Sequence, residues 1–190
     1  VKLRYIMMTM NKLTIAQFGN PVLRMQTKPL SKTQILNPDT KKLIGEMQSL
    51  LLDKKLGIGL ASTQVGESIS LAVIELQKTK VRPDIERMSL VIINPKITKV
   101  FGRRYQTWEG CISSGEGKAG LFAKVPRYKK VELEYLDENA VSHKKVFSGL
   151  AAHVIQHEVD HLNGTLFVDK VKDSTTYMTY SEYRKMKKAL

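Results

Sequence analysis

The chain contains 190 residues, of which 42% are hydrophobic and 26% are charged, a composition that predicts one folded domain over residues 1–190. No stretch approaches the roughly 18 consecutive apolar residues of a membrane span, which excludes an integral membrane protein. The formal charge of +13 favours polyanionic surroundings, but no basic-aromatic interleaving accompanies it, so we expect no sequence-specific nucleic-acid binding.

Residues 1–12, VKLRYIMMTMNK, are expected to form a loose N-terminal leader. They carry basic residues and a short apolar patch but lack the longer apolar run and cleavage site of a secretory signal. Cys111 is the only cysteine, so no internal disulfide can form, which fits a reducing compartment. We therefore expect a cytoplasmic protein.

The first helix is predicted to start at Asn37 and to stop at Gly57. Asn37 is a favourable N-cap, and Pro38 suits the first helical position. The apolar stripe that would face the core consists of Leu43, Ile44, Met47, Leu50 and Leu51.

Strands are predicted in the middle of the chain. LAVIEL (71–76) and MSLVIIN (88–94) are β-branched runs bounded by turn formers, and VELEYLD (131–137) alternates as a half-exposed strand does. Together with the helical patterns on either side, these runs indicate an α+β fold.

A second helix is predicted from Gly149 to Asn163 and Gly164, which supply a left-handed stop. A C-terminal helical tail is expected over residues 174–190. The full expectation is an α+β fold with mixed or antiparallel β-sheets around this second, central helix, which carries an HExxH pattern, plus an N-terminal-half helix and a C-terminal helix.

The HExxH pattern lies in QHEVDHLNG (156–164). His157 and His161 are one helical turn apart, which is the spacing that two imidazoles need to bind one tetrahedral ion. Glu158 could act as general base on a water that the metal activates. The alternative is an amphipathic helix with incidental histidines. His143 and His153 are not expected to be ligands, and His143 lies in a polar stretch typical of a solvated turn.

A catalytic site of this kind needs a third protein ligand. No histidine follows His161, and Glu182 is the only glutamate beyond it. Cys111 lies in WEGCISS, a short polar loop after a strand-like segment, and is the better candidate. Alone it would be interpreted as a structural thiol; with the histidines it completes a Cys-His-His set that suits zinc or ferrous iron.

GIGLASTQVG (57–66) is rich in glycine and small residues. Gly57 and Gly59 permit unusual dihedrals and close approach of another group, and Gln64 could offer an amide N–H to a developing oxyanion. On its own the stretch would be interpreted as a glycine-rich turn with a solvated glutamine.

Taken in order, GIGLASTQ, EGCIS and QHEVDH resemble the three signature motifs of the peptide deformylases. FGNPVLR, VPRYKKVELEYLD and HLNGTLFVD extend the resemblance over about residues 13 to 170. It implies a catalytic domain that removes the N-formyl group from the initiator methionine of nascent polypeptides and releases formate. It also implies one divalent metal ion, Fe²⁺ in the cell, with Zn²⁺, Ni²⁺ or Co²⁺ as substitutes.

The resemblance assigns roles to matching positions. Glu158 matches the catalytic glutamate, Gln64 and the backbone N–H of Ile112 match the oxyanion donors, and Gly59 matches a backbone position beside the substrate. The positions that match the metal ligands are Cys111, His157 and His161.

The methionine pocket is predicted from helical spacing. Leu150 and Val154 share the face of His157 and could line the pocket, which Ile58 could close; ordinary core packing remains the alternative for each.

In the tail, Tyr183, Met186 and Leu190 form an apolar stripe with lysines opposite, which suggests ribosome association as a hypothesis. The loop at 114–124 departs from the family pattern, so its conformation is left open.

Two other functions remain open at this point. One is a different HExxH metallohydrolase such as a peptidase, which the lack of a downstream third ligand disfavours. The other is a structural-zinc or RNA-binding protein, which would usually close its metal site with four protein ligands rather than three.

Overall fold

A computed structural model of the chain describes residues 13–53, 57–78 and 85–189. The predicted leader at 1–12 and Leu190 of the predicted tail stripe lie outside these residues. The helices and strands are α1 (Lys32–Ile35), α2 (Pro38–Asp53), β1 (Gly59–Ala61), β2 (Leu71–Leu76), β3 (Met88–Gly110), β4 (Leu121–Leu136), β5 (Ser142–Ser148), α3 (Gly149–Leu162), β6 (Met178–Thr179) and α4 (Tyr180–Lys188). No helix in these ranges is long and apolar enough to cross a membrane.

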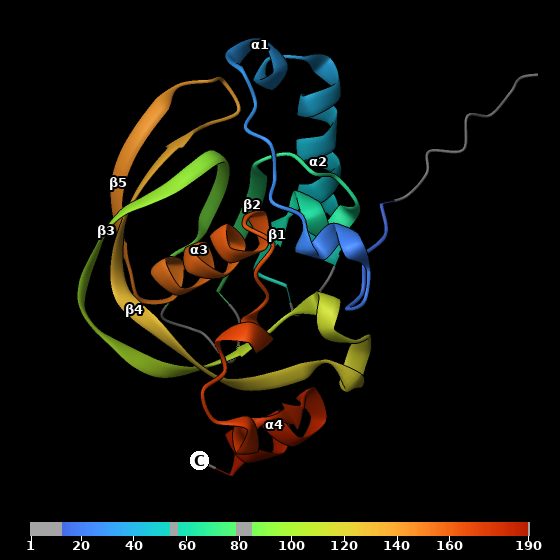
Figure 1. The fold of residues 1–190 in the computed structure, drawn as a ribbon, viewed down its shortest axis with the longest axis vertical. Coiled ribbons are helices and arrows are strands. Elements are labelled where there is room, and N and C mark those ends of the chain that lie inside the picture. The colour runs from blue at the N-terminus through green and yellow to red at the C-terminus, as the bar shows by residue number, and fades with distance from the viewer. Residues whose placement is uncertain (1–12, 54–56, 79–84, 190) are drawn as a thin grey trace, which may run out of the picture.

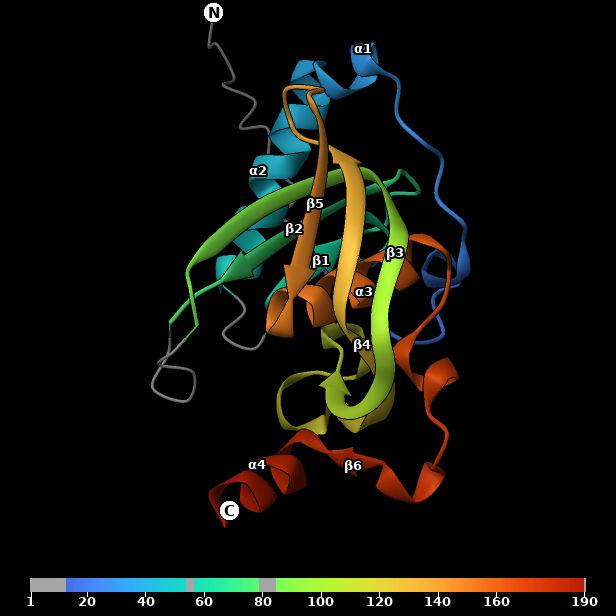
Figure 2. The same ribbon diagram turned by 90° about the vertical axis from the view of Figure 1, so that its left-hand side faces the viewer.

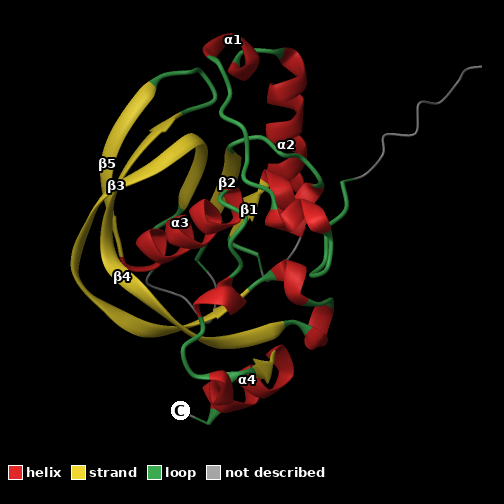
Figure 3. Cartoon of the chain, in the orientation of Figure 1, coloured by secondary structure: helices red, strands yellow, loops and turns green. Residues whose placement is uncertain are grey.

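The strands form one sheet in the order β1-β2-β3-β4-β5, and β6 pairs with β4. Each of these strand pairs is antiparallel. The sheet curves around α3, as Figures 1 and 3 show, so the expected α+β fold with a central HExxH helix is confirmed. Three register shifts between β3 and β4 help the long strands bend, because each irregularity increases the local twist.

Strand β2 is buried on both faces. Leu71 and Val73 pack into the cluster that includes the stripe of α2, whereas Ala72 and Ile74 pack into the cluster on the side of α3. Successive side chains of a strand point to opposite faces, so a continuous apolar run is what a strand between two helical layers needs. Figure 1 shows α2 and α3 on the two sides of this part of the sheet.

The predicted first helix corresponds to α2. The side chain of Asn37 accepts a hydrogen bond from the backbone N–H of Asp39 at 2.8 Å, which caps the helix as expected. Ile44, Met47, Leu50 and Leu51 are buried. The predicted stop at Gly57 follows residues 54–56, which lie outside the described part of the chain.

The predicted strands are correct in place but two of them are too short. The first run coincides with β2, whereas β3 continues past residue 94 to Gly110 and β4 begins at Leu121, before residue 131. The added start of β4 buries alternate residues, namely Ala123, Val125 and Arg127, but this run is short and includes a proline and an arginine, which hides the strand pattern in the sequence. Apart from Glu109, the extra residues of β3 are largely polar and partly or fully exposed, so no buried face gives them an alternating pattern. Cross-strand contacts hold them instead, such as Lys130 Nζ, which lies 5.0 Å from the ring centroid of Phe101 in the paired position.

The expectation of a solvated turn at His143 is wrong. His143 lies in β5 opposite Tyr135, and the two rings stack with centroids 5.1 Å apart. Its Nε2 is 2.8 Å from Oδ2 of Asp137. The turn lies just before it, where Ala140 has a positive φ of 60°.

Helix α3 ends at the predicted stop. Gly164 has a φ of 69°, and a Cβ at this position would lie 2.5 Å from the carbonyl oxygen of Arg24, so both conformation and space require glycine. Within the helix, the buried Gln156 amide pairs with the backbone of Tyr128 in β4, at 2.9 Å and 3.0 Å. This pair fixes α3 against the sheet.

Candidate metal centre

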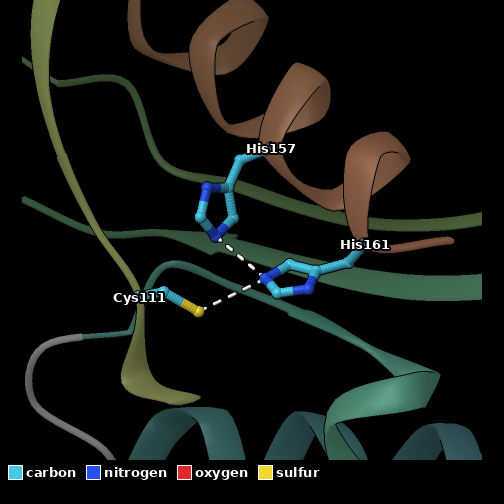
Figure 4. A group of neighbouring side chains, drawn as sticks. All are labelled: Cys111, His157 and His161. Atoms are coloured by element: carbon cyan, nitrogen blue, oxygen red, sulfur yellow. Dashed lines mark hydrogen bonds between the residues drawn. The ribbon is translucent and has the colours of Figure 1, made fainter. Parts of the chain in front are cut away.

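Three side chains from two segments that are distant in the sequence converge at α3. Cys111 directly follows β3, and His157 and His161 lie one turn apart in α3. Cys111 Sγ is 3.3 Å from His161 Nε2, which is 3.2 Å from His157 Nε2, and all three ligand atoms lie within 4.8 Å of one another. Figure 4 shows the sulfur and both Nε2 atoms pointing toward a common centre.

This geometry fits a divalent metal ion. Sulfur and nitrogen ligands at the usual bond lengths around a tetrahedral ion stand roughly 3.3 to 3.6 Å apart. The Nε2 atoms face each other in a buried site, where two lone pairs at this separation repel unless a proton or a cation lies between them. The donor set of one thiolate and two imidazoles suits zinc or ferrous iron.

Glu109 orients the first histidine. His157 Nδ1 lies 2.5 Å from Glu109 Oε1, so Nδ1 carries the proton and Nε2 is left as the ligand atom. Burial lowers the pKa of His157, but the charge of Glu109 outweighs it and the pKa stays well above its usual range. Binding of a cation at Nε2 therefore displaces a proton. Burial and the charge of His157 hold the pKa of His161 well below its usual range, so its imidazole is neutral.

Glu109 is the centre of a buried hydrogen-bond network that sequence reasoning missed. Arg127 donates to both of its carboxylate oxygens, at 2.8 and 2.6 Å, and His153 Nε2 lies 2.8 Å from Oε2. Arg127 also donates to Asp160 at 2.5 Å. His153, which was not expected to be a metal ligand, belongs to the support of the site through this contact. One signal was present: Glu109 and Cys111 are two positions apart at the end of a strand, where such residues share a face.

Glu158 lies at the base of the same site and is 1% exposed. A Cβ on Gly59 would lie 2.2 Å from Glu158 Oε1, so the glycine provides the space that this carboxylate occupies. Gly59 does not have a positive φ. The close approach of Glu158, rather than an unusual dihedral, therefore explains why glycine occupies this position. Burial raises the pKa of Glu158 to about 7. Its Oε2 is buried with no hydrogen-bond partner among the described residues.

Gln64 is held in one orientation. Its Oε1 accepts from the backbone N–H of Ala61 at 2.9 Å, which directs the Nε2 amide toward Ser113 Oγ at 3.1 Å and Cys111 Sγ at 3.4 Å. Gln64 is therefore a buried donor beside the candidate ligand Cys111 and not a solvated side chain. Ile112 directly follows Cys111 and opens a short 3-10 turn.

A cleft of about 740 Å³ opens onto this site. Its floor includes Glu158 and two of the ligands, and the expected pocket residues Ile58, Leu150 and Val154 all line it. The structure thus brings every site residue expected from the sequence into one region. The opposite wall was not anticipated: it includes Trp108 and Phe122 from the sheet and residues of α4.

The loop at 114–124 is ordered by Ser114. Its hydroxyl donates to the carbonyl of Cys111 at 2.6 Å and accepts from the N–H of Leu121 at 2.9 Å. These bonds fix the start of β4 directly beside the cysteine.

Comparisons with known proteins show to which family the chain is similar. The profile of the family described as Polypeptide deformylase matches residues 12–177. A peptide deformylase of Leptospira biflexa is 36% identical over 172 residues, covering 88% of this chain and 92% of the relative. One from Chlorobaculum tepidum is 40% identical over 159 residues, covering 84% of this chain and 79% of the relative. A solved structure of the class I type b peptide deformylase of Acinetobacter baumannii, with Met-Ala-Ser bound, is similar with a TM-score of 0.77 and 29% identity, covering 84% of this chain and 98% of that one.

Proposed function

The chain belongs to the peptide deformylase family, and from this premise we propose that Cys111, His157 and His161 hold the divalent ion with which it hydrolyses N-formylmethionyl peptides. The observation that carries the proposal is the convergence of these three ligand atoms beside a buried glutamate at the base of the cleft. The substrates are nascent polypeptides that begin with formyl-methionine, and the products are formate and a free amino terminus. Because such chains arise at the ribosome, we place the reaction in the cytoplasm.

When held by Cys111, His157 and His161, a divalent ion would supply Lewis acidity that favours attack by water near neutral pH. Glu158 faces the cleft next to these ligands. It takes a proton from the water as the oxygen attacks the formyl carbon, and it returns the proton to the amine nitrogen as the carbon–nitrogen bond breaks. Formate and the amine then leave.

Two donors stabilise the oxyanion that forms in the transition state. The Nε2 amide of Gln64 is oriented by its bond to Ala61, and the backbone N–H of Ile112 follows the metal-ligating cysteine directly in the chain. Fixed donors of this kind require no reorganisation during the reaction.

The methionine side chain is held by an apolar part of the cleft. Ile58, Leu150 and Val154 line it, and Val154 is buried. Gly59 lies beside Glu158, so its backbone is positioned to run along the substrate. An unbranched thioether fits such an apolar surface well.

The two alternatives expected from the sequence are not supported. The family match extends over residues 12–177. An HExxH peptidase would require a third ligand downstream of the helix, whereas the proposed third ligand, Cys111, lies upstream of it. Only three ligand groups meet among the described residues, which differs from the four of a usual structural zinc site. Ribosome association stays a prediction.

For the native metal we propose Fe²⁺, with Zn²⁺, Ni²⁺ or Co²⁺ able to replace it. The set of one thiolate and two imidazoles suits both iron and zinc, and the preference for iron rests on the resemblance to the peptide deformylases. A thiolate beside ferrous iron is sensitive to oxidation, so anaerobic purification followed by elemental analysis is the appropriate measurement.

Formate release from formyl-Met-Ala-Ser tests the function, because the similar A. baumannii structure contains Met-Ala-Ser. The metal-loaded parent is expected to release formate, and Glu158→Ala is expected to lose roughly 10²- to 10⁴-fold of the activity while it keeps its metal. Glu67→Ala, which removes an exposed carboxylate, serves as the matched control. Activity of Glu158→Ala within threefold of the parent at equal metal content would refute the assigned role.

A further inference from the structure

Helix α4 forms part of the cleft wall but lies beyond the residues that the family model matches. The match ends at residue 177, and α4 begins at Tyr180. Strand β6 pairs with the start of β4, and the N–H of Tyr180 donates to the carbonyl of Gly120 at 2.7 Å. Figures 1 and 2 show α4 at the end of the molecule opposite α1.

An aromatic cluster joins α4 to the metal site. The ring of Phe122 stacks on Tyr183 with centroids 4.4 Å apart and lies 5.6 Å from the ring of Tyr180. On its other side, this ring covers Gly110, where a Cβ would lie 2.4 Å from it. Because Gly110 precedes Cys111, the wall of the cleft is continuous from the metal ligands to α4.

The cleft-lining face of α4 is cationic. The residues of α4 that line the cleft are Tyr180, Tyr183, Arg184, Lys187 and Lys188, which recur at the spacing of one helical face. The expectation that the lysines lie opposite Tyr183 is therefore wrong for Lys187 and Lys188. Both are exposed, and neither makes a salt bridge with a described residue, whereas Lys185 is paired with Glu182 at 2.7 Å.

No acidic residue of the described ranges lines this part of the cleft wall. The acidic residues among the described lining residues are Glu109 and Glu158, and both are buried at the base of the site, where the network and the metal ligands surround them. The outer cleft thus presents positive charge next to aromatic rings, with no carboxylate among its described lining to neutralise it.

We propose that this face of α4 is a binding surface for acidic side chains in the part of the formylated peptide that follows the methionine. The inference rests on the proposed function, since that function places a peptide in the cleft. The occupant follows from continuity and charge: a chain whose formyl group reaches Glu158 leaves along a wall that ends in Arg184, Lys187 and Lys188. The surface therefore selects among formylated peptides by their acidic content.

The test compares amidated peptides, so that no terminal carboxylate contributes charge. Formyl-Met-Ala-Xaa-Xaa-Ala-amide is prepared with Glu, Gln or Lys at both variable positions, and kcat/KM is measured by formate release. For the parent at low ionic strength we expect the Glu peptide to exceed the Gln peptide by about three- to tenfold, as ion pairs near a surface allow. The ratio is expected to approach one in roughly 0.5 M salt, where exposed charges are screened.

Charge reversal locates the effect. Lys187→Glu combined with Lys188→Glu is expected to bring the ratio of kcat/KM for the Glu peptide to that for the Gln peptide below one. The same double variant is expected to raise the ratio of kcat/KM for the Lys peptide to that for the Gln peptide. The matched control, Lys32→Glu with Lys41→Glu, makes the same charge change in exposed residues of α1 and α2 and is expected to keep the parent ratio. If the reversed variant does not fold, the salt dependence of the parent and Lys187→Gln provide the same comparison.

Equal kcat/KM for the three peptides in the parent would overturn the proposal, as would an equal loss of preference in the control. A parent without peptide preference whose α4 reversal weakens binding of a duplex RNA would identify α4 as an RNA contact instead. Failure of the proposed function is separate, because the Gln peptide would then release no formate either.

Discussion

Replacing Glu109 by glutamine tests whether this buried carboxylate positions the metal ligand. Its two oxygens accept four hydrogen bonds, two from Arg127 and one each from His153 and His157, which uses the full capacity of a carboxylate. In Glu109→Gln one oxygen becomes an NH₂ group. Two donors then face a donor, and the charge opposite Arg127 is lost.

The cost can be worked from these bonds. A buried donor left without an acceptor costs about 1 to 3 kcal/mol, so two of them lower the free energy of unfolding by about 2 to 6 kcal/mol. Loss of a group that orients a metal-ligating histidine typically costs about 10- to 100-fold in metal affinity. Both effects are expected in Glu109→Gln, because the same carboxylate serves Arg127 and His157.

Two measurements separate the effects: urea unfolding of the metal-free protein, and competition with a chelator for the bound metal. Glu67→Gln, at an exposed carboxylate, is the control and is expected to match the parent in both. If Glu109→Gln unfolds within 0.5 kcal/mol of the parent, a value roughly the size of an ordinary surface substitution, the reasoning about the network is refuted. Unchanged metal affinity would refute the positioning of His157.

Four further predictions follow from single contacts. Gln64→Ala is expected to slow kcat by roughly 10²- to 10³-fold, as removal of one oxyanion donor does, with metal content unchanged. Gly59→Ala is expected to lose activity because its Cβ would lie 2.2 Å from an oxygen of Glu158; Gly45→Ala, with nothing within 4 Å, is the control. Leu150→Asp is expected to raise KM for formyl-Met peptides more than it weakens metal binding. Asp137→Asn is expected to lower Tm at pH 7, and the difference from the parent is expected to vanish at acid pH.

The expected decrease in Tm of Asp137→Asn at pH 7 follows from the contacts of Asp137 in the turn between β4 and β5. Burial raises the pKa of Asp137, but hydrogen bonds from His143 and from the backbone N–H groups of Val141 and Asn139 outweigh it and lower the pKa. A carboxylate whose folded pKa is lowered stabilises the protein above its usual value of 3.8, and this stabilisation is lost as pH falls through the folded pKa. A constant difference in Tm down to acid pH would contradict this account.

For the other three, the contradicting results are equally definite. Turnover of Gln64→Ala within threefold of the parent would remove that residue from oxyanion stabilisation. Full activity of Gly59→Ala would mean that Glu158 can move without consequence. An unchanged KM in Leu150→Asp would exclude this residue from the methionine pocket.

Local sequence patterns were sufficient for much of this site. His157, Glu158 and His161 lie within five residues of one helix, so their common face follows from helical geometry alone. The apolar stripe of α2 and the strand β2 could likewise be predicted from the sequence, because burial imposes a regular apolar pattern on them. The roles of all the site residues stay predictions; Ile112, Leu150 and Val154 each line the cleft.

Other features depend on contacts between distant segments, which no local pattern encodes. Glu109 and His157 are 48 positions apart, and they meet only because the long, bent β3 reaches α3. The outer part of β3 has little buried surface, and the start of β4 buries only alternate residues such as Ala123 and Val125, so the extent of both strands depended on their pairing with each other. The cationic face of α4 could not be predicted because its position depends on the pairing of β6 with the start of β4, which places the helix beside Phe122.

X-ray absorption at the metal edge of the anaerobically purified protein tests the central claim most directly. We predict one metal ion per chain with one sulfur ligand at about 2.3 Å and two imidazole nitrogens at about 2.0 to 2.1 Å, and we predict that the sulfur signal disappears in Cys111→Ser. An active enzyme whose metal has no sulfur ligand, or whose metal spectrum is unchanged in Cys111→Ser, would contradict the account.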